Sequence, residues 1–350
     1  MTVDGLYDLF CDALESLALQ PGQQLVAALG GGADSQTVLD LLMRYRRQHP
    51  QYDYLAIHLD HSFHPSSADW SSTIEEAAKA YGIPTIFESL DVPVANRQSK
   101  EAAGREGRYQ RMAELTQNDA VLLLGQHRND QIETFFLQLK RGSGPKGLSS
   151  MARIQAWTGK RRLCRPLLSV SKEQILDYAT QRNLTWIEDD TNYDTSIERN
   201  FLRHDVVPVL EQRWPQFGQS VLRAAKLCAE QQQVMDELLL EKLHNQQSHT
   251  RHFPILLLNQ RSEAMQRALL RTWLQEQKKP LPSYEQLEQI RRQALTARDD
   301  SQLQIQCDGY VVRYFQHALW CDVKVAELPG DSLVTETNVD LGKWGKLTVP

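Results

Sequence analysis

The sequence predicts an α/β fold, in which a doubly wound, mainly parallel sheet is followed by a smaller α+β domain. In the first half of the chain, short and nearly all-apolar segments alternate with amphipathic ones. Strands of this kind are typical of a parallel sheet that helices cover on both faces. In the second half, long amphipathic segments come first and short strand-like segments come last. That order favours a separate α+β domain.

The elements of the first domain follow from this alternation. The predicted strands are residues 23–29, 52–59, 83–90 and 120–126, and the predicted helices are residues 35–48, 67–81, 100–117 and 129–140. From about residue 141 to 165 the pattern breaks into a Gly-rich, basic segment, and another helix is expected at 171–182.

The "RWPQF" stretch at residues 213–217 predicts a domain boundary. We therefore expect a catalytic domain at 1–216, a helical α+β domain at 217–323 that binds substrate or tRNA, and the start of a truncated C-terminal domain at 324–350. The second domain is predicted to contain helices at 218–244, 262–276 and 283–295 and strands at 302–307, 310–315 and 318–323.

Composition narrows the class of protein. The chain has 350 residues, 41% of them hydrophobic and 24% charged, with a net charge of −5, so no global basic field indicates nucleic acid. No segment reads as a membrane span or a signal peptide. The five cysteines are scattered and form no CxxC pair, which favours structural thiols in a reducing cytoplasm over disulfides or zinc.

The stretch "LGGGADS" at residues 29–35 follows the first strand and opens a helix. Glycines let the backbone approach a ligand closely, and the N-terminus of the following helix attracts anions. A phosphate group is the expected guest. Ser35 can donate a hydrogen bond to it, whereas Asp34 suits Mg²⁺. The alternative is a tight turn in which the glycines only relieve steric crowding. A Walker A motif is excluded because no Lys-Ser or Lys-Thr follows.

Polar residues also follow two other predicted strands, and parallel strands bring their carboxyl ends to one edge of a sheet. His58, His61 and His64 form a weak zinc pattern without cysteine ligands, so a phosphate or base contact from His61 is favoured. After the fourth strand, Asp130 begins a helix, and the remaining polar residues of this cluster are His127, Asn129, Glu133 and Thr134. Ordinary helix capping explains part of this second cluster equally well.

Two basic features are separate from these clusters. Glu101, Arg105 and Arg108 share one helix face, which is either a solvated salt-bridged face or a binding surface. Between Lys140 and Arg165 lie eight basic and no acidic residues, with Trp157 among them. This segment is either a solvated loop or a track for a phosphate backbone.

Several motifs together resemble one family. "GGGADS" is similar to the glycine loop of the PP-loop ATP pyrophosphatase superfamily, whose fold is of the adenine nucleotide alpha hydrolase type. The rest of the ordered set resembles bacterial tRNA(Ile)-lysidine synthetases over residues 23–215, and more weakly to about 322: "HLDHS", "KEAAGREGRY", "QHRNDQIETFFLQLKRGSGPKGLSSM", "CRPLL" and "WIEDDTNYDTSIERNFLR".

The resemblance implies a reaction. ATP adenylylates the C2 oxygen of the wobble cytidine of a CAU-anticodon tRNA(Ile), pyrophosphate leaves, and free L-lysine displaces AMP to give lysidine, which changes codon reading from AUG to AUA. The implied catalytic residues are Asp34, Asp130, Glu133 and Arg108, with Glu133 receiving the lysine ammonium. Mg²⁺ is expected on Asp34 and Asp130.

The resemblance also assigns binding residues. ATP would be bound by Gly30, Gly31, Gly32, Ala33, Asp34, Ser35, His61 and His127. The residues expected to contact tRNA or substrate are Glu101, Arg105, Arg108, Asn129, Thr134, Lys140, Arg141, Arg199, Asn200 and Arg203.

Three positions depart from the family pattern. Gly30 replaces a serine, Asn129 replaces an aspartate, and Ser62 follows His61 where the family has glycine. Two alternatives therefore stay open: another PP-loop tRNA-modifying enzyme, and a catalytically weak tRNA-binding homologue. The sequence also leaves the oligomeric state open, with a homodimer as one alternative.

Overall fold

The computed structural model describes residues 2–60, 67–90, 100–244, 252–297, 303–323, 338–340 and 346–348. The chain divides into two compact units, Met1–Gln232 and Gln233–Pro350. Helix α10 (Phe217–His244) begins in the first unit and ends in the second.

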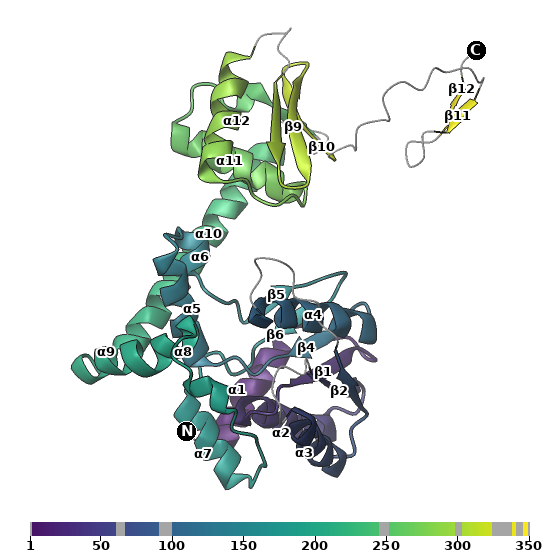
Figure 1. Cartoon of the computed structure of the whole chain (residues 1–350), viewed down its shortest axis with the longest axis vertical. Coiled ribbons are helices and arrows are strands. Elements are labelled where there is room, and N and C mark those ends of the chain that lie inside the picture. The colour runs from purple at the N-terminus through teal and green to yellow at the C-terminus, as the bar shows by residue number, and fades with distance from the viewer. Residues whose placement is uncertain are drawn as a thin grey trace. The chain divides into compact units, whose positions relative to one another are not determined.

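The first unit is built on a six-stranded sheet with the order β3-β2-β1-β4-β6-β5. Figure 1 labels β1, β2, β4, β5 and β6 of this sheet. Neighbouring strands are parallel except β5, which runs antiparallel to β6 at the sheet edge. The strands are β1 (Gln24–Leu29), β2 (Asp53–Asp60), β3 (Thr85–Ser89), β4 (Val121–Leu123), β5 (Ile154–Ala156) and β6 (Arg162–Cys164).

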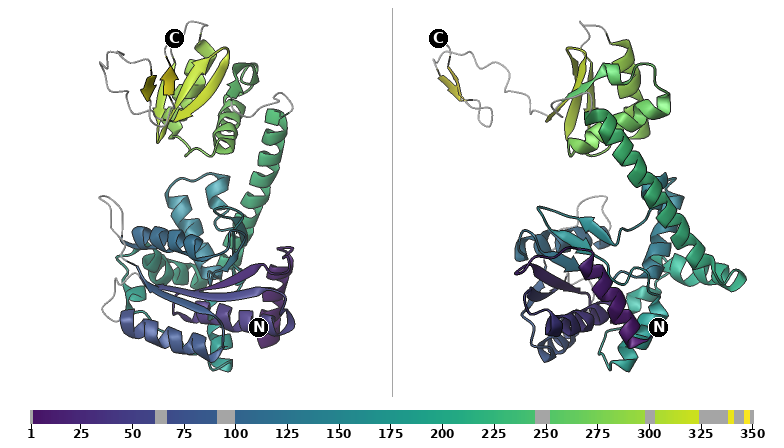
Figure 2. Two further views of the ribbon diagram at one scale, coloured as in Figure 1. Left: turned by 90° about the vertical axis from the view of Figure 1, so that its right-hand side faces the viewer. Right: turned by 180° about the vertical axis from the view of Figure 1, so that it is seen from behind.

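Helices cover both faces of this sheet (Figure 2). Alternate strand residues, such as Leu25 and Ala27, pack in one buried cluster with apolar side chains of four helices, whereas Val26 and Ile57 pack in another with Met112 of α4 (Lys100–Leu115). This alternation is what a sheet buried on both faces requires. The helices on the first face are α1 (Val3–Glu15), α2 (Ala33–Gln48), α3 (Ser67–Ala80) and α7 (Lys172–Gln181).

Asp40 of α2 ties the first face together. Its buried carboxylate accepts hydrogen bonds from Tyr81, from Tyr178 of α7 at 2.6 Å, and from two nitrogens of Arg182 at 3.0 Å each. Three segments far apart in the sequence therefore meet at one charge, which these donors compensate.

The remaining elements of the first unit follow the sheet strands or lead into α10. Apolar side chains of α5, α9 and α10, including Ile132, Val207 and Val221, form a small separate cluster. The elements are α5 (Arg128–Lys140), α6 (Pro145–Leu148), the 3-10 turn η1 (Asp190–Tyr193), α8 (Glu198–Phe201), the π-helical turn η2 (Leu202–Val206) and α9 (Val207–Arg213).

The second unit places helices against an antiparallel sheet of order β7-β10-β9-β8. Its core includes Phe253, Trp273, Ile290 and Tyr310. The elements are β7 (His252–Pro254), η3 (Ile255–Leu257), α11 (Glu263–Glu276), α12 (Tyr284–Thr296), β8 (Gln304–Cys307), β9 (Tyr310–Phe315) and β10 (Ala318–Val323); β11 (Asn338–Asp340) and β12 (Lys346–Thr348) form a separate pair.

The predicted fold class is confirmed, and the predicted strands and helices lie within a few residues of the observed ones. Sequence analysis missed α1 and the β5–β6 hairpin, which occupies part of the segment described as a basic loop. The domain boundary predicted at residues 216 and 217 coincides with the start of α10, and it stays a prediction. In the part of the chain that the structure describes, no helix combines the length and apolar character needed to cross a bilayer.

Candidate functional site

The glycine loop joins β1 to α2 in a conformation that depends on its glycines. Gly31 has φ +90°, and a Cβ at this position would lie 2.9 Å from Ile74 Cδ1. Its carbonyl accepts a hydrogen bond from the backbone of Ile187 at 3.0 Å. Only glycine adopts this positive φ and fits this space without strain. A Cβ on Gly30 or Gly32 would face open space instead, so the loop has room for a ligand there.

The start of α2 lies against the end of β4. A Cβ on Gly125 would lie 3.1 Å from Asp34 Cβ and 3.1 Å from the backbone nitrogen of Ser35. Gly125 therefore permits the glycine loop to approach the next strand, a role that sequence analysis did not assign. The Ser35 hydroxyl donates to the Gly32 carbonyl at 2.9 Å and closes the first turn.

His127 caps α5 and fixes Asp130. The backbone N–H of His127 donates to Asp130 Oδ2 at 2.9 Å, and His127 Nδ1 accepts from the backbone N–H of Asn129 at 3.2 Å. Because Nδ1 accepts, the neutral ring carries its proton on Nε2. This atom lies 3.7 Å from Asp34 Oδ1 and 3.5 Å from Asp130 Oδ2. The two predicted carboxylates thus converge on one buried imidazole.

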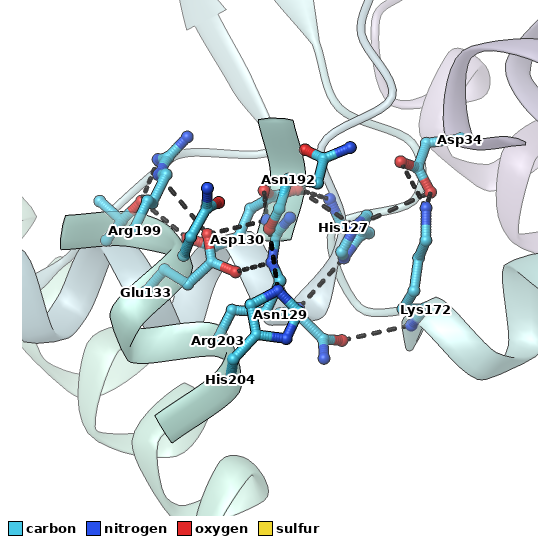
Figure 3. A network of polar contacts seen from close by, with 12 residues as sticks. Asp34, His127, Asn129, Asp130, Glu133, Lys172, Asn192, Arg199, Arg203 and His204 are labelled. Carbon is cyan, nitrogen blue, oxygen red and sulfur yellow. Dashed lines mark hydrogen bonds and ion pairs between the residues drawn. The ribbon is translucent and has the colours of Figure 1, made fainter. Parts of the chain in front are cut away.

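Asp34 has a second partner that sequence analysis missed. The ammonium of Lys172, at the first position of α7, lies 2.8 and 2.9 Å from the two oxygens of Asp34 (Figure 3). The backbone N–H of Lys172 donates to Asn129 Oδ1 at 3.2 Å. Asn129 thereby joins the N-termini of α5 and α7. The Lys172 ammonium thus places a positive charge of the chain itself at the carboxylate beside the glycine loop.

Glu133 is paired with arginine. It is 1% exposed, and its two oxygens accept from Arg203 Nε at 2.7 Å and Nη2 at 3.1 Å, with Arg199 Nε 3.5 Å away (Figure 3). Burial raises the pKa of Glu133, and the bond from Arg203 opposes this shift. Arg203 lies in the π-helical turn η2. Since the Arg203 guanidinium takes both oxygens, a lysine ammonium at Glu133 would have to displace Arg203 or share the carboxylate with it, and the role of Glu133 as lysine receptor stays a prediction.

Several predicted contact residues hold the site together instead. Asn200 is buried, and its amide donates to the carbonyls of Thr191 and Asp194 at 2.8 and 3.0 Å, so it helps to fold the chain around η1 while it lines the larger cavity described below. The Thr134 hydroxyl donates to the Asp130 carbonyl at 2.7 Å and accepts from Arg199 at 3.1 Å. These contacts give Asn200 and Thr134 a structural role, and direct tRNA binding by either residue stays a prediction.

Two adjoining cavities open at the carboxyl edge of the sheet. One, of about 370 Å³, is lined by the glycine loop together with Asp34, Ser35 and Asp130. The other, of about 590 Å³, is lined by His58, Trp70 and Arg203 among others. The residues that line both are Gly30, Leu59, Trp70, Arg108, Ile187, Asp189, Asn192 and Arg199. The predicted Arg108 and Arg199 therefore stand at the passage between them.

His58 supports this edge through hydrogen bonds of both its ring nitrogens. Its Nδ1–H donates to the Leu29 carbonyl at 2.9 Å, and its Nε2 accepts from Ser71 at 3.0 Å. Burial lowers the pKa of His58 and favours the neutral ring. The described residues contain no group of three His, Cys, Asp or Glu side chains that could hold a metal by themselves. His61, and the side chain of Glu101, lie outside the described part of the chain.

The other predicted residues lie around the cavities or on the surface. Arg105 lines the smaller cavity and lies over the Tyr109 ring. Lys140 pairs with Glu198, and Arg141 is exposed at the end of α5.

Three arginines of the basic segment bind backbone carbonyls within the protein. Arg161 donates to the carbonyls of Ala113 and Thr116 at 2.6 Å each, and Arg162 donates to the Leu17 carbonyl at 2.5 Å. Arg165 is buried and donates to the Ala152 carbonyl at 2.7 Å. These guanidiniums anchor the β5–β6 hairpin. Neither reading of the segment as a solvated loop or as a phosphate track anticipated this anchoring, and contact of the segment with a phosphate backbone stays a prediction.

Comparison with known proteins agrees with this geometry. Residues 9–210 match the model of the PP-loop domain, and residues 253–320 match that of the TilS substrate binding domain. Among solved structures, the chain is similar to a U34-tRNA thiolase, NcsA, from Methanococcus maripaludis, with a TM-score of 0.55 and 18% identity over 65% of this chain and 80% of that one. That likeness shows the fold.

Two curated relatives cover almost all of the chain. A tRNA(Ile)-lysidine synthase of Idiomarina loihiensis is 78% identical over 350 residues, which are 100% of this chain and 78% of that protein. The tRNA(Ile)-lysidine synthase of Vibrio cholerae serotype O1 is 39% identical over 95% of this chain and 76% of its own length. The matched domains, the extent of these similarities and the glycine loop at the sheet edge together show that the chain belongs to the tRNA(Ile)-lysidine synthase family.

Proposed function

We propose that the chain forms lysidine on tRNA(Ile) in an ATP-dependent reaction, with free L-lysine as the amine. The C2 oxygen of the wobble cytidine of the CAU anticodon attacks the α-phosphorus of ATP, and the bond to pyrophosphate breaks. The lysine ε-amine then attacks C2, and the C2–O bond breaks as AMP leaves with that oxygen. The amine loses protons in this second step.

The observation that carries the proposal is the convergence of phosphate-binding and cationic groups on the two adjoining cavities. The glycine loop and the N-terminus of α2 suit the leaving pyrophosphate. Arg108 and Arg199 line both cavities, where guanidiniums can stabilise charge on a phosphorus centre. A nucleotide in one cavity and an acceptor base in the other would meet between these two arginines.

We propose that the carboxylates of Asp34 and Asp130 bind Mg²⁺. Asp34 and Asp130 both approach His127 Nε2, so their oxygens lie near one another beside the glycine loop. Mg²⁺ in nucleotide sites is held by one or two carboxylates together with phosphate oxygens. When bound, the ion would neutralise charge on the departing pyrophosphate.

His127 has a positioning role in this scheme. Its Nε2–H faces Asp34 and Asp130, while its backbone and Nδ1 fix the first turn of α5. The ring is buried and 4% exposed. It therefore holds both carboxylates in place from a site that water does not enter freely.

The cytoplasm stays the predicted location of the protein.

The experiment that tests the function is transfer of labelled lysine to CAU-anticodon tRNA(Ile). Lysine should enter the tRNA only when ATP is present, with AMP and pyrophosphate released in equal amounts. A tRNA whose wobble base is uridine should accept none. Incorporation without ATP, or continued pyrophosphate release in the presence of lysine with no lysine transferred to the tRNA, would contradict the proposal.

A further inference from the structure

A third concave surface lies between α4 and the turn that joins β5 to β6. This groove has a volume of about 650 Å³, and its walls include Arg105, Tyr109, Trp157 and Arg161. The rings of Tyr109 and Trp157 meet edge to face, with centroids 5.7 Å apart and planes at 81°. The Arg105 guanidinium lies 5.2 Å from the centre of the Tyr109 ring. Rings and guanidiniums in this arrangement are the usual surface on which unpaired bases stack.

The aromatic wall of the groove is held in place. The backbone N–H of Trp157 donates to the Arg161 carbonyl at 2.8 Å and closes the turn. The Arg161 side chain donates to Thr116 Oγ1 at 3.0 Å and to the Ala113 carbonyl at 2.6 Å, which fixes the turn to the end of α4. Trp157 is half-buried against the cluster that includes Met112. A ring that is already ordered loses little conformational freedom when it stacks on a ligand.

The charges of the groove favour a base over a phosphate. Besides the two arginines, Glu106 and Glu114 line it. Glu114 pairs with Arg111 at 2.7 Å, and Arg161 is already bonded to backbone carbonyls. The groove therefore has no excess of positive charge directed into it. A flat, uncharged ring with polar edges suits such walls better than a phosphate does.

The groove also adjoins the nucleotide cavity. Arg105 and Tyr109 line both, because α4 runs along the two. An RNA loop whose modified base enters the cavity must lay its neighbouring nucleotides on the adjoining surface. We propose that this groove binds an unpaired base of the tRNA anticodon loop, other than the modified cytidine, stacked on Trp157. This inference rests on the proposed function for the identity of the RNA.

The test measures binding of a CAU anticodon stem–loop RNA to the full chain by fluorescence anisotropy, without ATP or lysine. Trp157→Leu should weaken binding about 5- to 100-fold, which is the loss of affinity expected when one stacking contact between a base and an aromatic ring is removed. Trp157→Phe should keep the affinity within roughly threefold, since the ring face remains. Trp214→Leu is the matched control, because Trp214 is 54% exposed at the end of α9 and lies outside the groove.

A second arm identifies the base. Stem–loops with a single abasic site at each loop position are bound to the wild-type protein and to Trp157→Leu. One position other than the wobble cytidine should lose affinity with the wild type and show no further loss with Trp157→Leu, as coupled partners do. Thermal melting of each variant confirms folding.

Unchanged RNA affinity of a folded Trp157→Leu variant overturns the inference. So do losses that add equally at every abasic position, because Trp157 would then only shape the surface. Lysine transfer by the wild-type chain is measured separately. A chain that transfers no lysine but shows the coupled losses would contradict the proposed reaction while supporting the groove.

Discussion

The ammonium of Lys172 lies 2.8 Å from Asp34 Oδ1 and 2.9 Å from Asp34 Oδ2, so the first residue of α7 neutralises the carboxylate beside the glycine loop. Both groups are partly exposed, at 36% and 26% of their side chains. The pair is therefore within reach of solvent and of a ligand in the cavity. A divalent cation that binds Asp34 must displace this ammonium or share the carboxylate with it.

Lys172→Met should therefore make Asp34 more available to Mg²⁺. A neutral side chain removes a competing cation, so we expect the Mg²⁺ concentration for half-maximal activity to fall by roughly two- to tenfold. The measurement is a Mg²⁺ titration of tRNA-dependent pyrophosphate release at fixed ATP. Lys226→Met is the control, because Lys226 pairs with Glu230 on the surface of α10. An unchanged or higher Mg²⁺ requirement would show that Asp34 is not the metal ligand with which Lys172 competes.

Asp34→Ala should reduce pyrophosphate release by a factor on the order of 100 or more, because a group that positions charge in the transition state is removed. Asp69→Ala, at an exposed position of α3, should leave the rate unchanged. Near-normal release by a folded Asp34→Ala protein would rule out the proposed role of this carboxylate.

Glu133→Gln should affect ATP and lysine alike. Glu133 holds Arg203 and lies near Arg199, which lines both cavities. Losing one charge of a buried pair destabilises the fold, here by about 2–3 kcal/mol, which is below the usual range because Arg203 is 31% exposed. Steady-state kinetics should show kcat/KM falling together for both substrates, and Glu198→Gln, on the exposed partner of Lys140, serves as the control. A rise confined to the KM of lysine would restore Glu133 as a lysine receptor.

Local sequence patterns predicted the first domain well, for physical reasons. Buried parallel strands require continuous apolar runs, and residues that follow them must meet at one sheet edge. The same rule predicts that Asp34 and Asp130 lie near one another, and both approach His127 Nε2. The glycine loop could likewise be predicted from the sequence, since the positive φ of Gly31 requires glycine.

Pairings across the chain were not predictable in the same way. Nothing near Glu133 in the sequence indicates that Arg203 will take its two oxygens, and Lys172 reads locally only as a residue after a helix cap. The strands β5 and β6 are three residues each, too short for a periodic signal. The segment was therefore interpreted as either a solvated loop or a phosphate track, although Arg161, in the turn between the two strands, is bonded to the end of α4.

Asp40→Asn should lower the free energy of unfolding at neutral pH and should make that free energy depend less on pH in the acidic range. Burial tends to raise the pKa of Asp40, but hydrogen bonds from Arg182, Tyr178 and Tyr81 outweigh this and hold it below its ordinary value of 3.8. A depressed folded-state pKa gives stabilisation that is present above the unfolded-state pKa and lost as pH falls through the folded-state pKa.

The measurement is urea unfolding from pH 7 to pH 2.5. The loss for Asp40→Asn should be roughly 2 kcal/mol at pH 7, moderated by the 38% exposure of Arg182, and should shrink below pH 4. Asp4→Asn, whose carboxylate is 86% exposed beside Arg44, should follow the wild type throughout. A constant difference at every pH would mean that the charge of Asp40 does not contribute.

Arg161→Ser and Lys160→Ser should separate anchoring from tRNA binding within the basic segment. The Arg161 guanidinium makes four hydrogen bonds, to Thr116 Oγ1, to Asn118 Oδ1 and to the carbonyls of Ala113 and Thr116, so its loss should cost about 2 kcal/mol or more in urea unfolding. Lys160 is exposed, and its backbone N–H, which a substitution keeps, donates to the Asn118 carbonyl. Lys160→Ser should therefore unfold like the wild type.

If the Lys160 ammonium contacts a tRNA phosphate, Lys160→Ser should reduce the magnitude of the slope of log K for tRNA binding against log salt by roughly 0.7–0.9. An unchanged slope would leave this segment with a structural role alone, whereas wild-type stability of Arg161→Ser would contradict the anchoring that we assign to Arg161.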